Sequence, residues 1–326
     1  FYGQAQEGDL ETRNINLQYG TGLPDGSFFI SASLYEQDPI YARDRKVARN
    51  ADTRALGGTD QRSSATPDSR ISLPGGQTLI AQDSGYRPAT DEDLFNYQAY
   101  TSAVVPLERT SIYTNASYDF NESVTGYTEL SYLDTEATAT LAPTPIFTAF
   151  EQDPLSVAAD AVYNPFGEEL LDVRRRLLEF PERTQLNESE VTRFSAVVEG
   201  LYDTWNWDAA YNWSRSEASE VTRGIVNADR LRRAIGPADN CLGTTIDGCQ
   251  AVNITGPLGS LTPEQADYIS ATGEVSGYSK LSSISFNVSN AFELLAAGRS
   301  DLALGLEHRM ESTSKRPSAL LATTNT

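Results

Sequence analysis

Few side chains in this sequence have the types and spacing that catalysis or metal binding requires. His308 is the sole histidine, so it has no second imidazole with which to hold a metal ion or share a proton transfer. The sequence contains no GxGxxG, P-loop, HExxH or GxSxG pattern, and no arrangement of Ser, His and an acid for nucleophilic attack. We therefore expect no enzyme, no cofactor, and no catalytic or metal-binding residue.

Two cysteines, Cys241 and Cys249, lie close together in a Gly-containing segment. Two thiols without further ligands make a poor metal site, whereas a small loop disulfide is typical of an oxidising compartment, so we expect the disulfide. The acidic run Asp91–Asp93 offers oxygen ligands to a divalent cation. A solvated loop is the favoured interpretation of that run.

The basic run Arg174–Arg176 stands in a strongly acidic chain, with 45 acidic against 25 basic residues and a formal net charge of −20. Such a charge excludes favourable contact with nucleic acid phosphates. The run either pairs with Glu168, Glu169 and Asp172, which is the favoured interpretation, or binds an anionic lipid headgroup or an anionic substrate. Loop aromatic rings either stack on a ring of a bound solute or pack within their loops. The candidate substrate contacts are Tyr97, Tyr100, Tyr163, Phe166, Arg174 and Arg175.

The elements that would hold these residues are indicated by alternating apolar and polar side chains, the period of a strand with one apolar face. In Trp205–Ser214 one parity holds three tryptophans and a tyrosine, and the other holds Asn206, Asp208 and Asn212. His308 shares the parity of the leucines before it, which places it on an apolar, lipid-facing or interfacial side. Eight segments show the alternation: Asn14–Tyr19, Phe28–Tyr35, Thr110–Phe120, Val124–Leu133, Phe194–Tyr202, Trp205–Ser214, Ser283–Glu293 and Asp301–Glu307.

The connections between these segments alternate between short and long. Four are tight hairpin turns. They lie at Gly20–Gly26, Asn121–Ser123, Asp203–Thr204 and Ala296–Ser300. The three connections between the hairpins span roughly 70, 50 and 60 residues, far more than is usual in compact domains. These connections are polar, and we expect short helices at Val226–Ile235 and Pro263–Ile269, the latter after the N-cap Thr262.

Short turns on one side of a sheet and long loops on the other are the topology of a transmembrane β-barrel. A helical membrane protein is excluded, because no apolar run reaches the length that a helix needs to cross a bilayer. A soluble β-sandwich or β-solenoid is the alternative, since its strands also alternate. The loop asymmetry, the aromatic residues near both ends of Trp205–Ser214 and the polar opposite face all favour the barrel.

The run LERTSIYTNASYDF from Leu107, with NESVTGYTELSY after it, resembles the barrel region of proteobacterial TonB-dependent receptors. Further segments resemble the same family in the same order, and the resemblance covers Leu10 to Met310, nearly the whole chain. These segments are YNPFG at Tyr163–Gly167, WNWDAAYNWSRS at Trp205–Ser216, VNADRLRRAIG at Val226–Gly236, the two cysteines, and NITGPLGSLTPEQADYI at Asn253–Ile269.

The resemblance implies an all-β fold, an antiparallel transmembrane barrel of about 22 strands in the bacterial outer membrane, with long extracellular loops and short periplasmic turns. It also implies contact with outer-membrane lipid and lipopolysaccharide, and a plug with a TonB box that couples import of a siderophore or oligosaccharide to the TonB complex. The plug, the TonB box and the closing C-terminal strand are not in this sequence. We therefore expect residues 1–326 to be one partial barrel domain of about eight strands, truncated at both ends. The alternatives are a passive general or sugar-specific porin and a soluble carbohydrate-binding β-protein.

Overall fold

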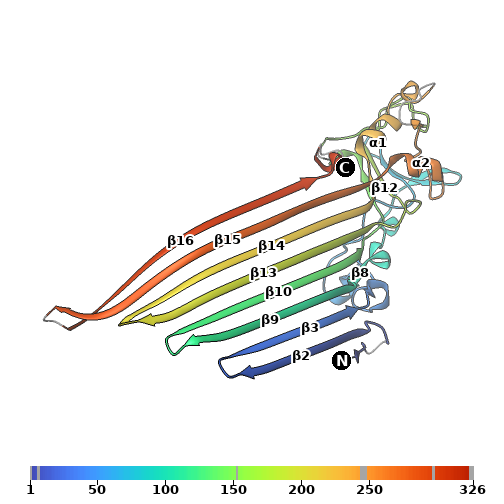
Figure 1. Ribbon diagram of the computed structural model, residues 1–326. Helices are drawn as coiled ribbons and strands as arrows, with labels where there is room; N and C mark the ends of the chain where they lie inside the picture. The colour runs from blue at the N-terminus through green and yellow to red at the C-terminus, as the bar shows by residue number, and fades with distance from the viewer. Residues whose placement is uncertain (1, 6–7, 152, 243–247, 296–297, 323–326) are drawn as a thin grey trace.

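The computed structural model describes residues 2–5, 8–151, 153–242, 248–295 and 298–322, and its main feature is one antiparallel sheet of long strands (Figure 1). Within the described residues the sheet is open, because β1 and β16 lie at its two edges and do not pair with each other. The strands, in their order across the sheet, are β1 (Tyr2–Gly3), β2 (Thr12–Leu23), β3 (Gly26–Gln37), β9 (Leu107–Asn121), β10 (Val124–Thr140), β13 (Thr184–Tyr202), β14 (Trp205–Val226), β15 (Ser270–Leu295) and β16 (Gly298–Pro317).

The predicted all-β, antiparallel fold is confirmed, and all eight predicted strands are present. Every one of them is longer than its alternation indicates. In β14 the alternation ends near Ser214, because Arg215 and Glu217 occupy the parity that the tryptophans hold before them, yet the strand continues to Val226. Its backbone remains paired with β13 as far as Thr222. Backbone pairing therefore continues where the side chains no longer alternate.

The hairpin turns are tight. The turn between β13 and β14 contains only Asp203 and Thr204, as predicted, and Asp203 has a positive φ of 57°, which an Asp side chain tolerates. The turn predicted at Gly20–Gly26 is shorter than expected, because β2 continues to Leu23, which pairs with Gly26. Of the turn predicted at Ala296–Ser300, residues 296 and 297 lie outside the described residues.

The three long connections, residues 38–106, 141–183 and 227–269, gather at one end of the sheet (Figure 1). The second and third are shorter than predicted, because the adjoining strands continue into them. Their described residues are called the loop body below. The loop body contains two further sheets that the sequence did not predict. One has the order β11 (Pro145–Phe147), β12 (Asp172–Arg176), β5 (Arg70–Ser72), β6 (Thr78–Gln82) and β7 (Gly85–Pro88), and the other pairs β4 (Ile40–Tyr41) with β8 (Ser102–Val104).

Both predicted helices are present. Helix α2 (Pro263–Ile269) has the predicted bounds, and its N-cap Thr262 accepts a hydrogen bond from the amide of Gln265 at 3.3 Å. Helix α1 (Ala228–Ala234) begins after the cap Asn227. A third short helix, α3, spans Ala319–Ala322. No helix in the described part of the chain is both long and apolar enough to cross a membrane. The 3-10 turns are η1 (Ala42–Asp44), η2 (Arg54–Leu56), η3 (Asp91–Asp93), η4 (Tyr97–Tyr100), η5 (Thr148–Phe150) and η6 (Ala238–Asn240).

The hydrophobic core lies in the loop body and not in the long sheet. Ile71 from the first connection, Leu170 from the second and Ile254 from the third are each at most 1% exposed and belong to one packed cluster. The three connections thus share a single core. The sequence predicted polar loops with short helices but not this core, in which scattered apolar residues from all three connections pack together.

Candidate functional site

One face of the long sheet is an apolar surface that continues from strand to strand. Trp207 on β14 pairs with Gly200 on β13 and with Val288 on β15, and Val288 pairs with Leu304 on β16. Partners across an antiparallel pair lie on the same face, so the apolar parity of each strand meets that of the next. The large apolar members of this surface, the apolar band, are Ile15, Leu17, Tyr19, Phe28, Ile30, Leu34, Ile112, Tyr118, Leu130, Tyr132, Phe194, Val198, Trp207, Tyr211, Trp213, Ile284, Phe286, Val288, Leu302, Leu304 and Leu306.

No other layer of the described residues covers the apolar band. Leu17 is 69% exposed and Leu306 is 75% exposed. His308, which pairs with Ile284, is also exposed on this face. Contiguous exposed apolar surface of this extent is rare on soluble monomers, where it marks an interaction with protein or membrane.

Aromatic rings lie toward both ends of the apolar band. On the side of the turns, Tyr118 contacts Phe120 with ring centroids 5.3 Å apart, and Trp205 contacts Phe292 at 6.5 Å. Trp213 lies on the side of the loops. Beyond Trp213, toward the loops, the residues on the same face are charged. They are Arg215 and Glu217 on β14, and Lys280 on β15, which lies 4.8 Å over the ring of Tyr278.

Successive hairpins are displaced in one direction along the sheet (Figure 1). Gly26 at the start of β3 pairs with Tyr118, although β9 continues to Asn121. In the same way, Asn206 near the start of β14 pairs with Ser289, although β15 continues to Leu295. Each hairpin therefore extends beyond the one before it, which is the stagger that tilted strands have in a sheet that curves into a barrel.

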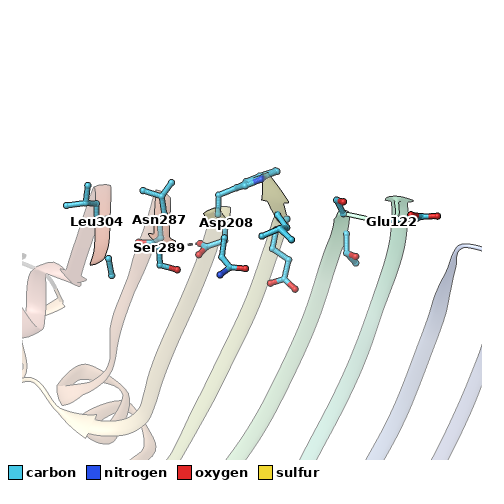
Figure 2. A pocket seen from close by; sticks show the side chains of 15 residues that line it. Glu122, Asp208, Asn287, Ser289 and Leu304 are labelled. Atoms are coloured by element: carbon cyan, nitrogen blue, oxygen red, sulfur yellow. Dashed lines mark hydrogen bonds between the residues drawn. The ribbon is translucent and has the colours of Figure 1, made fainter. Parts of the chain in front are cut away.

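The opposite face is mainly polar, although it also holds the Phe29 and Tyr113 rings, with centroids 6.3 Å apart. Ser27 and Ser117 are hydrogen-bonded at 2.8 Å, and Asn287 donates to Asp208 across β15 and β14 at 2.8 Å. Figure 2 shows the second of these pairs at the turn end of the sheet, beside a hollow of about 740 Å³. Residues of β10, β13, β14, β15 and β16 and of the turn before β10 line this hollow, and Trp207, Val288 and Leu304 of the apolar band are among them. Glu199 also lines this hollow. A face of hydroxyl, amide and carboxylate groups is suited to contact with water.

Arg175 is the centre of a hydrogen-bond network that joins all three long connections. Its side chain is 0% exposed and forms an ion pair with Glu179 at 2.6 Å. It donates to the hydroxyl of Ser69 in the first connection at 3.4 Å and to the carbonyl of Pro257 in the third at 3.1 Å. Further acceptors in the third connection are the carbonyls of Asn253 and Gly256 and the hydroxyl of Ser260. Burial lowers the pKa of Arg175, and the charge of Glu179 opposes that shift.

Arg175 was predicted to contact the solute, but its side chain is buried and has no exposed surface for such a contact. The acidic partners also differ from the prediction. Arg174 pairs with Asp172 at 2.6 Å as expected, whereas Arg175 pairs with Glu179, and Glu169 accepts from Ser156 instead of an arginine. The spacing of Arg175 and Glu179, four residues apart, can be read from the sequence. The backbone carbonyls that complete the network lie about eighty positions away in the chain and leave no local signal.

Arg176 is the remaining arginine of the run, and it is 6% exposed. It donates to the carbonyl of Pro143 at 2.6 Å and to the hydroxyl of Ser63 at 2.7 Å. Burial, and then the positive charge of Arg183, lower the pKa of Arg176 to about 10. Burial also lowers the pKa of Arg183.

The four predicted aromatic contacts lie in two parts of the loop body, Tyr97 and Tyr100 in the first connection and Tyr163 and Phe166 in the second. Tyr100 is 37% exposed and packs against Phe95 with centroids 5.6 Å apart, and Tyr97 is in the same 3-10 turn, η4. Tyr163 is also 37% exposed, and its hydroxyl accepts from Gln265 of α2 at 2.9 Å. Phe166 packs against Tyr86 at 4.9 Å. Tyr100, Tyr163 and Phe166 each have a packing or hydrogen-bonding partner, and the role of all four rings as solute contacts stays a prediction.

The two cysteines form a disulfide, with Cα atoms 5.1 Å apart. The acidic run is also engaged locally. Asp93 accepts from Arg87 at 2.9 Å and from the amide of Thr90 at 2.8 Å, which closes a capping box on η3. The Arg87 guanidinium is the main cause that lowers the pKa of Asp93 to about 2. No group of three or more His, Cys, Asp or Glu residues among those described is arranged to hold a metal ion.

No protein-family model and no curated protein sequence matches this chain. Solved structures that are similar to it include the ferric-catecholate import receptor Fiu from E. coli K12 in its open form. The identity is 11% and the TM-score is 0.29, over 94% of this chain and 43% of that one. The chain thus spans less than half the length of that receptor. A likeness at this level carries no inference about function.

Proposed function

We propose that this chain forms wall and outer loops of a bacterial outer-membrane β-barrel that imports a bulky solute, a siderophore or an oligosaccharide, with energy from the TonB complex. The apolar band is the observation that supports the wall. Eight strands present exposed apolar side chains in register on one face, with aromatic residues toward the ends and charged residues beyond. A lipid-facing wall needs this pattern, whereas a soluble sheet buries its apolar face under a second layer.

The size of the band also supports a lipid-facing wall. From Trp205 to Trp213 the band measures about 27 Å along the strand, at about 3.4 Å per residue. For strands tilted by about 35–45°, that length corresponds to about 19–22 Å along the membrane normal, comparable to the lipid-facing bands of known barrels, which are about 25 Å tall. The polar face is then the water-filled lumen side, and the loop body is the outer surface on which a solute is captured.

Adjacent alanines in the middle of β14 give a matched test of the wall. Ala209 has the parity of the apolar band and Ala210 has the polar parity. A nitroxide attached at Ala209→Cys in reconstituted protein should collide readily with dissolved oxygen and poorly with a water-soluble nickel complex, and one at Ala210→Cys should do the reverse. Equal accessibility to the nickel complex at both positions would contradict a lipid-facing wall and favour a soluble β-protein.

The transport step is tested separately in cells. Deletion of the gene should abolish growth on, or uptake of, the imported solute. Collapse of the proton gradient across the inner membrane should stop uptake by the wild-type strain, because a TonB-coupled receptor needs that gradient. Uptake that continues at the same rate without the gradient identifies a passive porin instead.

A further inference from the structure

The arginines of the loop body differ in how their charges are balanced. Arg174 has Asp172 and Arg175 has Glu179. Arg176 and Arg183 form no ion pair with a carboxylate within the described ranges of the chain, although the sequence has 45 acidic residues. Two arginines without a carboxylate partner, in a chain of net charge −20, require an explanation.

The Arg176 side chain and the Arg183 backbone contact one segment, residues 141–143. Arg176 donates to the carbonyl of Pro143, and the carbonyl of Arg183 accepts from the amide of Leu141 at 2.8 Å. Both residues therefore lie against residues 141–143, and the positive charge of Arg183 lowers the pKa of Arg176. The other acceptor on Arg176 is the hydroxyl of Ser63, so neutral oxygens hold this cation in place without neutralising it.

The two residues differ in access to solvent. Arg176 is 6% exposed, and its Nε is buried without a hydrogen-bond partner. Arg183 is partly exposed, and its side chain makes no hydrogen bond to the described residues. A buried charge is costly unless an opposite charge or several hydrogen bonds compensate it, and two like charges side by side increase that cost.

We propose that Arg183, together with the buried charge of Arg176, binds an anionic group of the solute, a carboxylate or a phosphate. An arginine offers paired N–H donors that match two oxygens of such a group, and the second cation strengthens the attraction where water is partly excluded. This proposal deepens the proposed import function, on which its biological role rests, by assigning an anionic class of solute.

Binding is measured on the protein purified in an uncharged detergent at low ionic strength, with citrate as the carboxylate probe and inorganic phosphate as the second probe. At least one of them should bind the wild type, and Arg183→Gln should weaken that binding at least tenfold. The matched control is Arg232→Gln, because Arg232 is partly exposed but already pairs with Asp153 and Asp229. This control should bind within twofold of the wild type.

A thermal melt separates a binding defect from misfolding. Without an anion, Arg183→Gln should melt at or above the wild-type temperature, because it removes one of two neighbouring like charges. The probe that binds should raise the melting temperature of the wild type and not that of the variant. The proposal is overturned if neither probe binds the wild type, or if Arg183→Gln binds as tightly as the wild type. If the wild-type protein binds the anion but wild-type cells show no energy-dependent uptake, the proposed function alone is contradicted.

Discussion

At the scale of single residues, Arg175 is the side chain on which the loop body depends most. Arg175→Ala leaves the largely buried carboxylate of Glu179 without its cation, with one hydrogen bond from the amide of Gly259, and frees acceptors in two other connections. Loss of one partner of a buried ion pair costs about 3–5 kcal/mol. Hydrogen exchange followed by mass spectrometry should then show faster exchange in peptides from all three connections at once, with the long strands unchanged.

The control for this substitution is Arg54→Ala, whose side chain is 60% exposed and pairs with Asp52 and Asp60 at the surface. Exposed ion pairs contribute little to stability, so exchange should change only near residue 54. Faster exchange restricted to the second connection in Arg175→Ala would show that Arg175 does not join the three connections.

Asp93 gives a prediction about pH. Its folded-state pKa of about 2 lies below the ordinary value of 3.8, chiefly because of Arg87. The carboxylate therefore stabilises the fold fully above the ordinary pKa, and this stabilisation is lost as the pH falls from about 4 toward 2. The difference in melting temperature between wild type and Asp93→Asn should be constant above about pH 5 and should shrink below pH 4. A difference that persists unchanged at pH 2 would contradict the role of the charge.

The sequence could predict the types of these residues but not their partners. The disulfide pairing required only two cysteines close in the chain. The burial of Arg175 depends on carbonyls of the Asn253–Ser260 segment, and that of Ile71 on Leu170 and Ile254. These residues are single apolar or polar positions in aperiodic segments, and no local pattern indicates that they meet.

At the scale of elements, the close pairing of β3 with β9 depends on a glycine. A Cβ at Gly26 would lie 2.2 Å from the backbone oxygen of Ser117, whereas a Cβ at Gly22, in the same hairpin, would meet nothing within 4 Å. Gly26→Ala should therefore reduce the yield of folded protein, judged by heat-modifiable migration on gels, and Gly22→Ala should not. Equal yields would mean that the backbone at Ser117 moves aside at little cost.

Strand existence was predictable, and strand length was not. Alternation identified all eight long strands because their middle parts separate an apolar from a polar face. It failed beyond Trp213, where Arg215 and Glu217 replace the aromatic residues while backbone pairing continues. The short strands β5, β6 and β12 were missed for another reason. They are three to five residues long and packed on a shared core, so they show no period of two.

At the scale of the whole molecule, the two faces of the sheet should respond oppositely to charge. Ala209→Arg places a guanidinium in the middle of the apolar band, which in a bilayer costs about 2–4 kcal/mol. Ala210→Arg places it on the polar face, where water solvates it. Unfolding by denaturant of protein reconstituted in vesicles should show the destabilisation for Ala209→Arg only. Equal effects of the two substitutions would argue against contact with lipid on the apolar face.

The shared core of the loop body limits how such a molecule can be altered. Residues from three connections, far apart in the chain, complete one another's packing, so no single connection is a self-sufficient module. Grafting one of them onto another wall would leave Ile71, Leu170 or Ile254 without its neighbours. Exchange of recognition properties between proteins of this design therefore has to transfer all three connections together, or repack the core that they form.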